Sequence, residues 1–263
     1  MIEWQVWSAG CGDPYGPDGI RNPISVELDK RHALPGEAKP RIFPMLNVNK
    51  SDLTRHHAPA TATDRVALGL VHFGIKAVDV LFARRYGGQA VVFETIAAVP
   101  PMVAATLLHL KCLRRMLDDR GWVRTFMDEA ENQRAHLMAF VALQQPRGWE
   151  RMLIALGQGV FYNAFFLLYL ISARTAHRFA GYLSEQAVFG YSQYLDHIES
   201  DDRGGRNAPT TAIDYWDLPV DAKVRDMILA MREDEAIHRD LHHAFADALA
   251  DGRDIPDRPG RLV

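Results

Sequence analysis

The chain has 263 residues, a formal net charge of −3 and 48% hydrophobic residues. This mildly acidic composition argues against nucleic acid as a partner, because nucleic-acid binding usually needs a basic face. The two cysteines, Cys11 and Cys112, lie far apart without a C-x-x-C spacing, which excludes a disulfide framework and suits a reducing compartment.

The first 60 residues are rich in proline, glycine and scattered charge, and they predict an irregular N-terminal arm. The beginning of the chain has no basic segment followed by an apolar one, and it contains too many acids and glycines for a transit peptide. We therefore expect no signal or transit peptide, and we expect a bacterial protein that lies peripherally on the cytoplasmic face of a membrane.

Helical periodicity begins at a cap, Thr63 or Asp64, and continues to about residue 250. Pro100 and Pro101 should kink the second helix, because proline has no amide N–H to donate. The expected helices cover about residues 66–85, 89–119, 122–144, 149–172, 176–199 and 220–250. Strand signals are absent, so we predict an all-α fold with one helical domain over residues 61–250 and a tail over 251–263.

Residues 152–172 are uncharged and long enough to cross a membrane. Gly157, Gln158, Gly159 and Asn163 weaken that interpretation. The alternatives are burial in the core or a position in the membrane interface with one apolar face toward lipid, and hydropathy does not choose between them.

Three segments carry side chains suited to a metal. Glu94 lies in an apolar run, where an unpaired carboxylate costs several kcal/mol, so we favour a site over a solvent-facing position. Glu235 and His238 form an E-x-x-H pair, whose side chains share one helix face, and Gln133 and His136 have the same spacing with an amide in place of the acid. One such pair is a weak signal, but ferritin-like bundles build dinuclear centres from glutamates and E-x-x-H pairs on four helices.

Longer motifs carry a resemblance to one family. They are RRYGGQAVVFETIAAVPPMV, DEAENQRAHLMAF, GVFYNAFFLLYLISARTAHRFAGYLSEQAVFGYSQYL and AIDYWDLPVDAKVRDMILAMREDEAIHRDLHH. Over about residues 61–250 the chain resembles the alternative oxidases, which are di-iron ubiquinol oxidases. The resemblance implies six helices with a ferritin-like four-helix core, interfacial membrane-binding helices, two irons and a homodimer. It also implies oxidation of quinol and reduction of oxygen to water without proton pumping.

The resemblance also assigns residues. The family's iron-ligand positions fall on Glu94, Gln133, His136, Ser184, Glu235 and His238. The redox tyrosine falls on Tyr191, with Asp234 and Asn132 as further catalytic candidates and His177, Tyr215 and Trp216 in the polar network around them. The quinone pocket falls on Gln89, Phe93 and Gln186, where glutamines stand at two positions that the family usually fills with charged residues.

Gln133 and Ser184 leave only Glu94 and Glu235 as anionic ligands. Two carboxylates balance the charge of one divalent ion, whereas two ferrous ions need four in a dry core. The sequence therefore predicts one metal, or a weakly bound second, held by Glu94, His136, Glu235 and His238. This leaves two further alternatives open: an iron-dependent oxygenase acting on another small molecule, and an inactive homologue kept for binding or structure.

Two more histidines, His242 and His243, follow His238 on the last helix. We expect them to be exposed or to cap the helix end rather than to bind metal.

Overall fold

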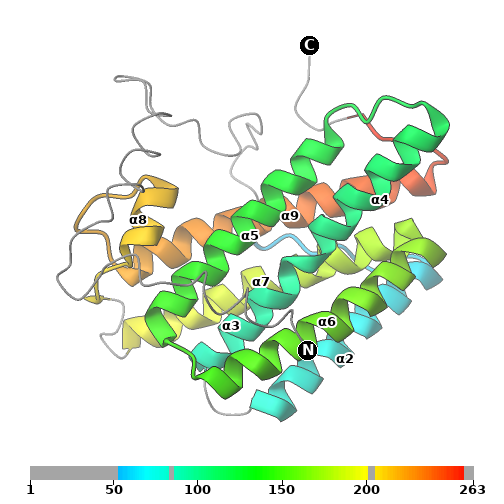
Figure 1. Ribbon diagram of the computed structural model, residues 1–263. Coiled ribbons are helices and arrows are strands. Elements are labelled where there is room, and N and C mark those ends of the chain that lie inside the picture. Colours follow the sequence, from blue (N-terminus) through cyan, green and yellow to red (C-terminus); the bar gives the residue numbers. More distant parts are fainter. Residues whose placement is uncertain (1–52, 83–85, 201–204, 258–263) are drawn as a thin grey trace, which may run out of the picture. The chain divides into compact units, whose positions relative to one another are not determined.

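The computed structural model describes residues 53–82, 86–200 and 205–257, with side chains described outside residues 79–89 and 199–200. The helices are α2 (Ala62–Phe82), α3 (Tyr86–Ala97), α4 (Val99–Arg115), α5 (Trp122–Gln144), α6 (Gly148–Ile171), α7 (Ala173–Ser200), α8 (Thr210–Trp216) and α9 (Val224–Ala250) (Figure 1). Over these residues the only strand-like pairing is an isolated bridge between Asn207 and Lys223. The predicted all-α fold is confirmed, while most of the predicted N-terminal arm lies outside the described residues.

The second predicted helix is divided into α3 and α4 at Ala98. Ala98 still donates its amide to the Glu94 carbonyl at 3.1 Å, but Pro100 and Pro101 in the first turn of α4 have no amide to donate. The break therefore lies just ahead of the prolines, as the sequence predicts. It leaves Glu94 in the last turn of α3, inside the bundle.

The remaining helices differ little from the predicted ranges. The 205–223 connection contains a short helix, α8, which the periodicity did not predict because it has only two turns. Before α5 the chain turns through Arg120 and Gly121, both with positive φ, of 52° and 82°. Glycine is favoured at the second of these because it lacks the Cβ that such a φ would crowd.

The bundle core forms where α7 packs along α9, with α2 against α7 and with α3 and α4 against α5. One apolar cluster gathers around Trp122, Phe126 and Phe245, and a second around Phe140 and Met231. Polar side chains are fully buried between the helices as well, and they include Glu94, Asn132, Gln133, His136, Glu235 and His238. A buried carboxylate such as that of Glu94 or Glu235 needs a hydrogen-bonding partner, an opposite charge or a metal.

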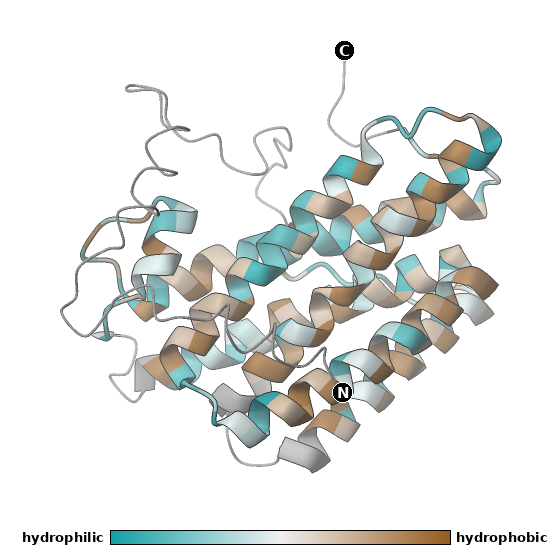
Figure 2. Cartoon of the chain, in the orientation of Figure 1, coloured by the Kyte–Doolittle hydropathy of each residue, from teal (hydrophilic) through white to brown (hydrophobic). Residues whose placement is uncertain are grey.

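Two described helical stretches are long and apolar enough to cross a membrane, Ala90–Arg115 and Gly148–Ile171. The first is mostly buried in the bundle, whereas the second, α6, has only 6% of its apolar window buried. Phe165 and Tyr169 are the buried residues of α6, and Figure 2 shows hydrophobic residues along the rest of it. The structure thus rules out core burial for residues 152–172, one of the two alternatives that hydropathy left open.

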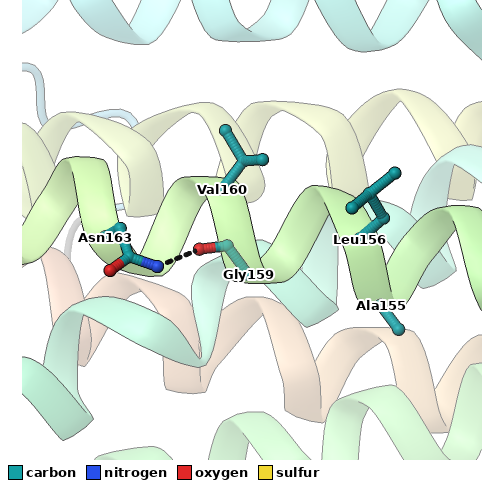
Figure 3. Close-up of a pocket in the computed structure, with 5 residues that line it drawn as sticks. All are labelled: Ala155, Leu156, Gly159, Val160 and Asn163. Atoms are coloured by element: carbon teal, nitrogen blue, oxygen red, sulfur yellow. Dashed lines mark hydrogen bonds between the residues drawn. The ribbon is translucent and has the colours of Figure 1, made fainter.

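A shallow hollow lies on the outer side of α6, lined by Ala155, Leu156, Gly159, Val160 and Asn163 (Figure 3). Asn163 donates its side-chain amide to the Gly159 carbonyl at 2.8 Å, so this polar group is satisfied within the helix. The hollow contains none of the buried carboxylates, and it belongs to the apolar outer face of α6.

Candidate metal centre

Three ligand-type side chains from three helices converge in the bundle. Glu94 of α3, His136 of α5 and Glu235 of α9 each place one ligand atom within 4.8 Å of the others. His136 Nδ1 lies 3.3 Å from Glu94 Oε2 and 3.6 Å from Glu235 Oε1. Among the described residues this is the one cluster of three or more histidines, cysteines or acids with that geometry. It contains three of the four predicted metal ligands.

Asp234 orients His136 from the opposite side of the ring. Its Oδ2 lies 3.3 Å from His136 Nε2, and it also accepts from Trp216 Nε1 at 2.8 Å and Asn132 Nδ2 at 2.7 Å. Asn132 Nδ2 further approaches the Tyr215 hydroxyl at 3.2 Å. Because a carboxylate can only accept, Asp234 fixes a proton on His136 Nε2, and a metal bound between Glu94 and Glu235 would take the place of the proton on Nδ1.

Replacing Asp234 by asparagine is expected to weaken metal binding about 10- to 100-fold, the usual cost of losing a partner that orients a ligand. Asparagine can turn its amide N–H toward His136 Nε2 and so favour the tautomer with the proton on Nδ1. Metal titration of Asp234→Asn measures the effect, and Asp214→Asn on the exposed side of α8 is the matched control. Equal affinities in the two variants would contradict the orienting role.

The cluster fits a cation. Glu94 Oε2, His136 Nδ1 and Glu235 Oε2 are buried and have no hydrogen-bond partner, although leaving such atoms unpaired is costly. Burial alone would lower the pKa of His136, but the carboxylates of Asp234, Glu235 and Glu94 raise this pKa well above its usual value. Burial raises the pKa of Glu94. The raised pKa of His136 indicates that the cluster stabilises positive charge at its centre, and carboxylates and imidazole are both donor types that non-haem iron accepts.

Tyr191 of α7 lies directly against this cluster. Its hydroxyl donates to Glu94 Oε1. Burial, together with the charges of Glu94 and Glu235, raises the pKa of Tyr191 well above its usual value, so the phenol keeps its proton. Phe140 stacks on the ring at 6.1 Å between centroids. The predicted redox tyrosine is therefore placed one hydrogen bond from a candidate metal ligand.

Gln133 lies where a further carboxylate would face the cluster. Its Nε2 donates to Glu235 Oε1 at 2.6 Å and lies 3.1 Å from His238 Nδ1. The reverse orientation of the amide would place two oxygens against each other, so the N–H side must face Glu235. His238 Nδ1 is also 3.6 Å from Glu235 Oε2, which puts His238 beside the three-residue cluster rather than in it. Ser184 is buried on α7.

Glu185, the acid next to Ser184, belongs to a different cluster. Its carboxylate accepts from the His57 amide at 2.8 Å and contacts His56 Nδ1 at 2.6 Å and His243 Nε2 at 3.0 Å. These contacts tie the segment before α2 to α7 and α9. Glu185 is therefore committed to structural contacts and does not compensate for Ser184.

The predicted quinone-pocket residues are only partly described. Phe93 is half-buried and packs against both apolar clusters, and Gln186 is half-buried on α7. The side chain of Gln89 lies outside the described residues.

His177 and His242 depart from the sequence-based expectations. His177 bonds to Tyr169 and His242 instead of joining Asn132, Tyr215 and Trp216. The prediction that His242 and His243 are exposed or capping is wrong, because both are buried and hydrogen-bonded. His242 follows His238 by four residues and so lies on the same helix face, a signal from which its burial could have been predicted.

Comparison with known proteins decides the family. A family profile described as Alternative oxidase matches residues 47–247. The chain belongs to the alternative oxidase family. It is 48% identical over 211 residues to alternative oxidase 3, mitochondrial, of Glycine max, and 46% identical over 208 residues to ubiquinol oxidase, mitochondrial, of Mangifera indica. These matches cover 80% and 79% of this chain and 65% of each relative.

A third relative, ubiquinol oxidase 1a, mitochondrial, of Arabidopsis thaliana, is 42% identical over 97% of this chain and 73% of its own length. These names correct one prediction. The expected location, a bacterial cytoplasmic membrane face without a transit peptide, is wrong, because the relatives are named as mitochondrial proteins of plants. That prediction rested on the composition of the first residues, and these residues lie outside the described part of the chain.

Proposed function

We propose that this chain is a quinol:oxygen oxidoreductase that reduces oxygen to water with a non-haem iron centre. Membership of the alternative oxidase family and the ubiquinol oxidase names of its relatives support this activity. The observation that carries the proposal is the convergence of Glu94, His136 and Glu235 beside Tyr191. When bound, iron supplies the electron-transfer chemistry between quinol and oxygen.

The residues of the chain would bind the metal, orient its ligands, supply a proton and exclude water. Glu94, His136 and Glu235 would hold the metal, and Asp234 keeps the His136 lone pair directed at it. Tyr191 holds a proton at Glu94 Oε1 and is a group that can release a proton and an electron together. The surrounding apolar side chains exclude water, which strengthens each electrostatic contact in the site.

We further propose that the centre holds one metal firmly. The Gln133 amide uses one oxygen of Glu235 and approaches His238 Nδ1, and both of these atoms would otherwise be available to a second ion. An amide N–H donates where a cation would accept, so it occupies that position without adding negative charge. The firm site is then Glu94, His136 and Glu235, with His238 as a weaker fourth ligand.

The same observation favours a second candidate function. Mononuclear iron oxygenases hold one iron with two histidines and one carboxylate and leave coordination positions open, and here Glu235 lies 3.6 Å from both His136 and His238. The Gln133 contact with Glu235 is therefore the specific argument for an oxygenase that acts on another small apolar molecule.

Oxygen uptake separates these functions. The iron-loaded chain should consume oxygen when supplied with a quinol, and cyanide should not inhibit it. Stoichiometric iron without quinol-dependent uptake would favour the oxygenase, and a chain that takes up no iron would favour an inactive homologue.

We propose that α6 lies in a membrane interface. The exposed large hydrophobic side chains of this helix are Trp149, Met152, Leu153, Leu156, Val160, Tyr162, Leu167, Leu170 and Ile171. The other side of α6 packs against α3, α4 and α7, so lipid cannot surround it as it surrounds a spanning helix. A hydrophobic quinol dissolved in the bilayer would then reach the bundle from this side, and the names of the relatives point to a mitochondrial membrane.

Introducing Leu156→Glu and Val160→Glu together is expected to abolish binding to lipid vesicles, because each buried apolar side chain contributes about 1.5–3 kcal/mol. Both residues are about two-thirds exposed, so the fold should be retained. Flotation with vesicles measures the effect. Val220→Glu, at an exposed apolar position outside α6, is the control and should still bind. Unchanged flotation of the α6 variant would contradict the proposal.

We also propose a homodimer. The apolar residues Val66, Leu70 and Phe73 are exposed at i, i+4 and i+7 spacing on one face of α2, which suits contact with a second copy.

A further inference from the structure

Four buried polar side chains form a continuous hydrogen-bonded row across four helices. The Tyr169 hydroxyl of α6 lies 3.1 Å from His177 Nε2 of α7, and His177 Nδ1 lies 2.9 Å from His242 Nδ1 of α9. His242 Nε2 in turn lies 2.9 Å from Glu129 Oε1 of α5. His177, His242 and Glu129 are at most 2% exposed, and Tyr169 is 9% exposed. The candidate metal cluster uses none of these residues.

The chemistry of the four groups fixes the direction of the row. With Glu129 as a carboxylate, which only accepts, the proton of His242 lies on Nε2 and its Nδ1 is bare. His177 must then donate from Nδ1, which leaves its Nε2 free to accept from Tyr169. In every hydrogen bond of the row, the donor is thus the residue nearer Tyr169 and the acceptor is the residue nearer Glu129.

Aromatic rings cover the two histidines of the row. Phe126 stacks on His242 at 5.4 Å, and Phe245 stacks on His177 at 4.2 Å between centroids. Burial, and next to it the charge of His242, lowers the pKa of His177 well below its usual value, so this ring stays neutral. A neutral imidazole with one N–H and one bare nitrogen is the form that passes a proton on.

The two ends of the row lie in different surroundings. Tyr169 lies between Leu167 and Ile171 on α6, and both of these residues are more than half exposed. Glu129 precedes Gln133 by four residues on the same face of α5, and Gln133 contacts Glu235 and His238 of the cluster region. Glu129 Oε2 is buried without a hydrogen-bond partner. The row therefore runs from the apolar outer helix to the neighbourhood of the metal cluster.

We propose that Tyr169, His177, His242 and Glu129 form a proton relay between the α6 side of the bundle and the metal cluster. A proton arriving at the Tyr169 oxygen displaces the phenol proton to His177 Nε2. The His177 Nδ1 proton moves to His242 Nδ1, and the His242 Nε2 proton moves to Glu129, so the net change is one proton gained by Glu129. This relay rests on the proposed function, since reduction of oxygen to water consumes protons while oxidation of quinol releases them.

The test compares Tyr169→Phe and His242→Gln with the parent chain, as iron-loaded full-length protein supplied with a short-chain quinol. Phenylalanine removes only the hydroxyl, and glutamine can still donate to Glu129 but has no acceptor at the Nδ1 position. Both variants should keep the parent iron content and KM, lose about 100-fold in kcat, and show a larger solvent isotope effect because proton delivery becomes rate-limiting.

His243→Gln is the matched control, because His243 is also buried on α9 but bonds to Glu185 outside the relay. It should keep the parent kcat and isotope effect. Relay variants within twofold of the parent kcat would overturn the proposal, and so would an equal loss in all three variants, which would indicate structural damage.

A parent chain that does not oxidise quinol would contradict the proposed function without testing the relay. In that case the relay is tested by the tautomers of His177 and His242, read from ¹⁵N spectra of the zinc-substituted full chain. Neutral rings with the proton on Nδ1 of His177 and on Nε2 of His242 support it. A doubly protonated ring at either position has no accepting nitrogen and would overturn it.

Discussion

Glu235→Gln should lose iron binding and, with it, quinol-dependent oxygen uptake. Glu235 is fully buried and faces His136, His238 and Gln133, so it is the most connected ligand of the cluster. Removing one member of a buried charge pair costs about 3–5 kcal/mol. That corresponds to a loss of more than about 100-fold in metal affinity. Iron titration of the purified variant is the direct measurement.

The control for this experiment is Glu233→Gln, which makes the same chemical change two residues earlier on the exposed side of α9. It should retain the parent iron content and oxygen uptake. If Glu235→Gln bound iron as tightly as Glu233→Gln, the three-residue cluster would not be the metal site.

Gln133→Glu should convert the centre from one metal to two. The Gln133 Nε2 now lies 2.6 Å from Glu235 Oε1, and a carboxylate oxygen in its place would face another carboxylate at this distance. Such a pair is strongly repulsive without a cation between the two groups. We therefore expect the metal-free variant to melt below the parent and the iron-loaded variant to bind a second equivalent. Thermal melting with and without iron, together with iron analysis, measures both effects.

Adding Ser184→Glu to Gln133→Glu would supply a fourth carboxylate and should tighten the second site further. Gln144→Glu, at the exposed end of α5, adds the same charge away from the cluster and should change neither melting nor iron content. A Gln133→Glu, Ser184→Glu chain that still bound a single iron would show that the charge argument is wrong.

The helical part of the fold was predictable because long periodic segments with few strand-forming stretches leave little choice of class. The break before Pro100 and Pro101 also followed from local chemistry, since proline lacks an amide to donate. The short helix α8 did not, because two turns carry too little periodicity. The position of α6 was left open by hydropathy and needed the packing of the other helices to resolve it.

At the candidate site, i and i+3 spacing correctly grouped Gln133 with His136 and Glu235 with His238 on inward faces. Spacing cannot show which side-chain atoms meet across helices. The Gln133 contact with Glu235 is therefore visible only in the structure. The same holds for His177, which hydrogen-bonds to His242 and not to the predicted polar network. Glu129 and Tyr169 were not predicted as site residues, because a lone acid or tyrosine on an amphipathic helix has no distinctive sequence pattern.

We propose that Gln133 leaves a cluster of Glu94, His136 and Glu235 with room for one firmly bound iron. This iron stoichiometry can be measured by iron analysis of the purified full chain after anaerobic loading. The prediction is one iron per chain that survives desalting. Two irons retained with similar affinity, or none, would contradict it.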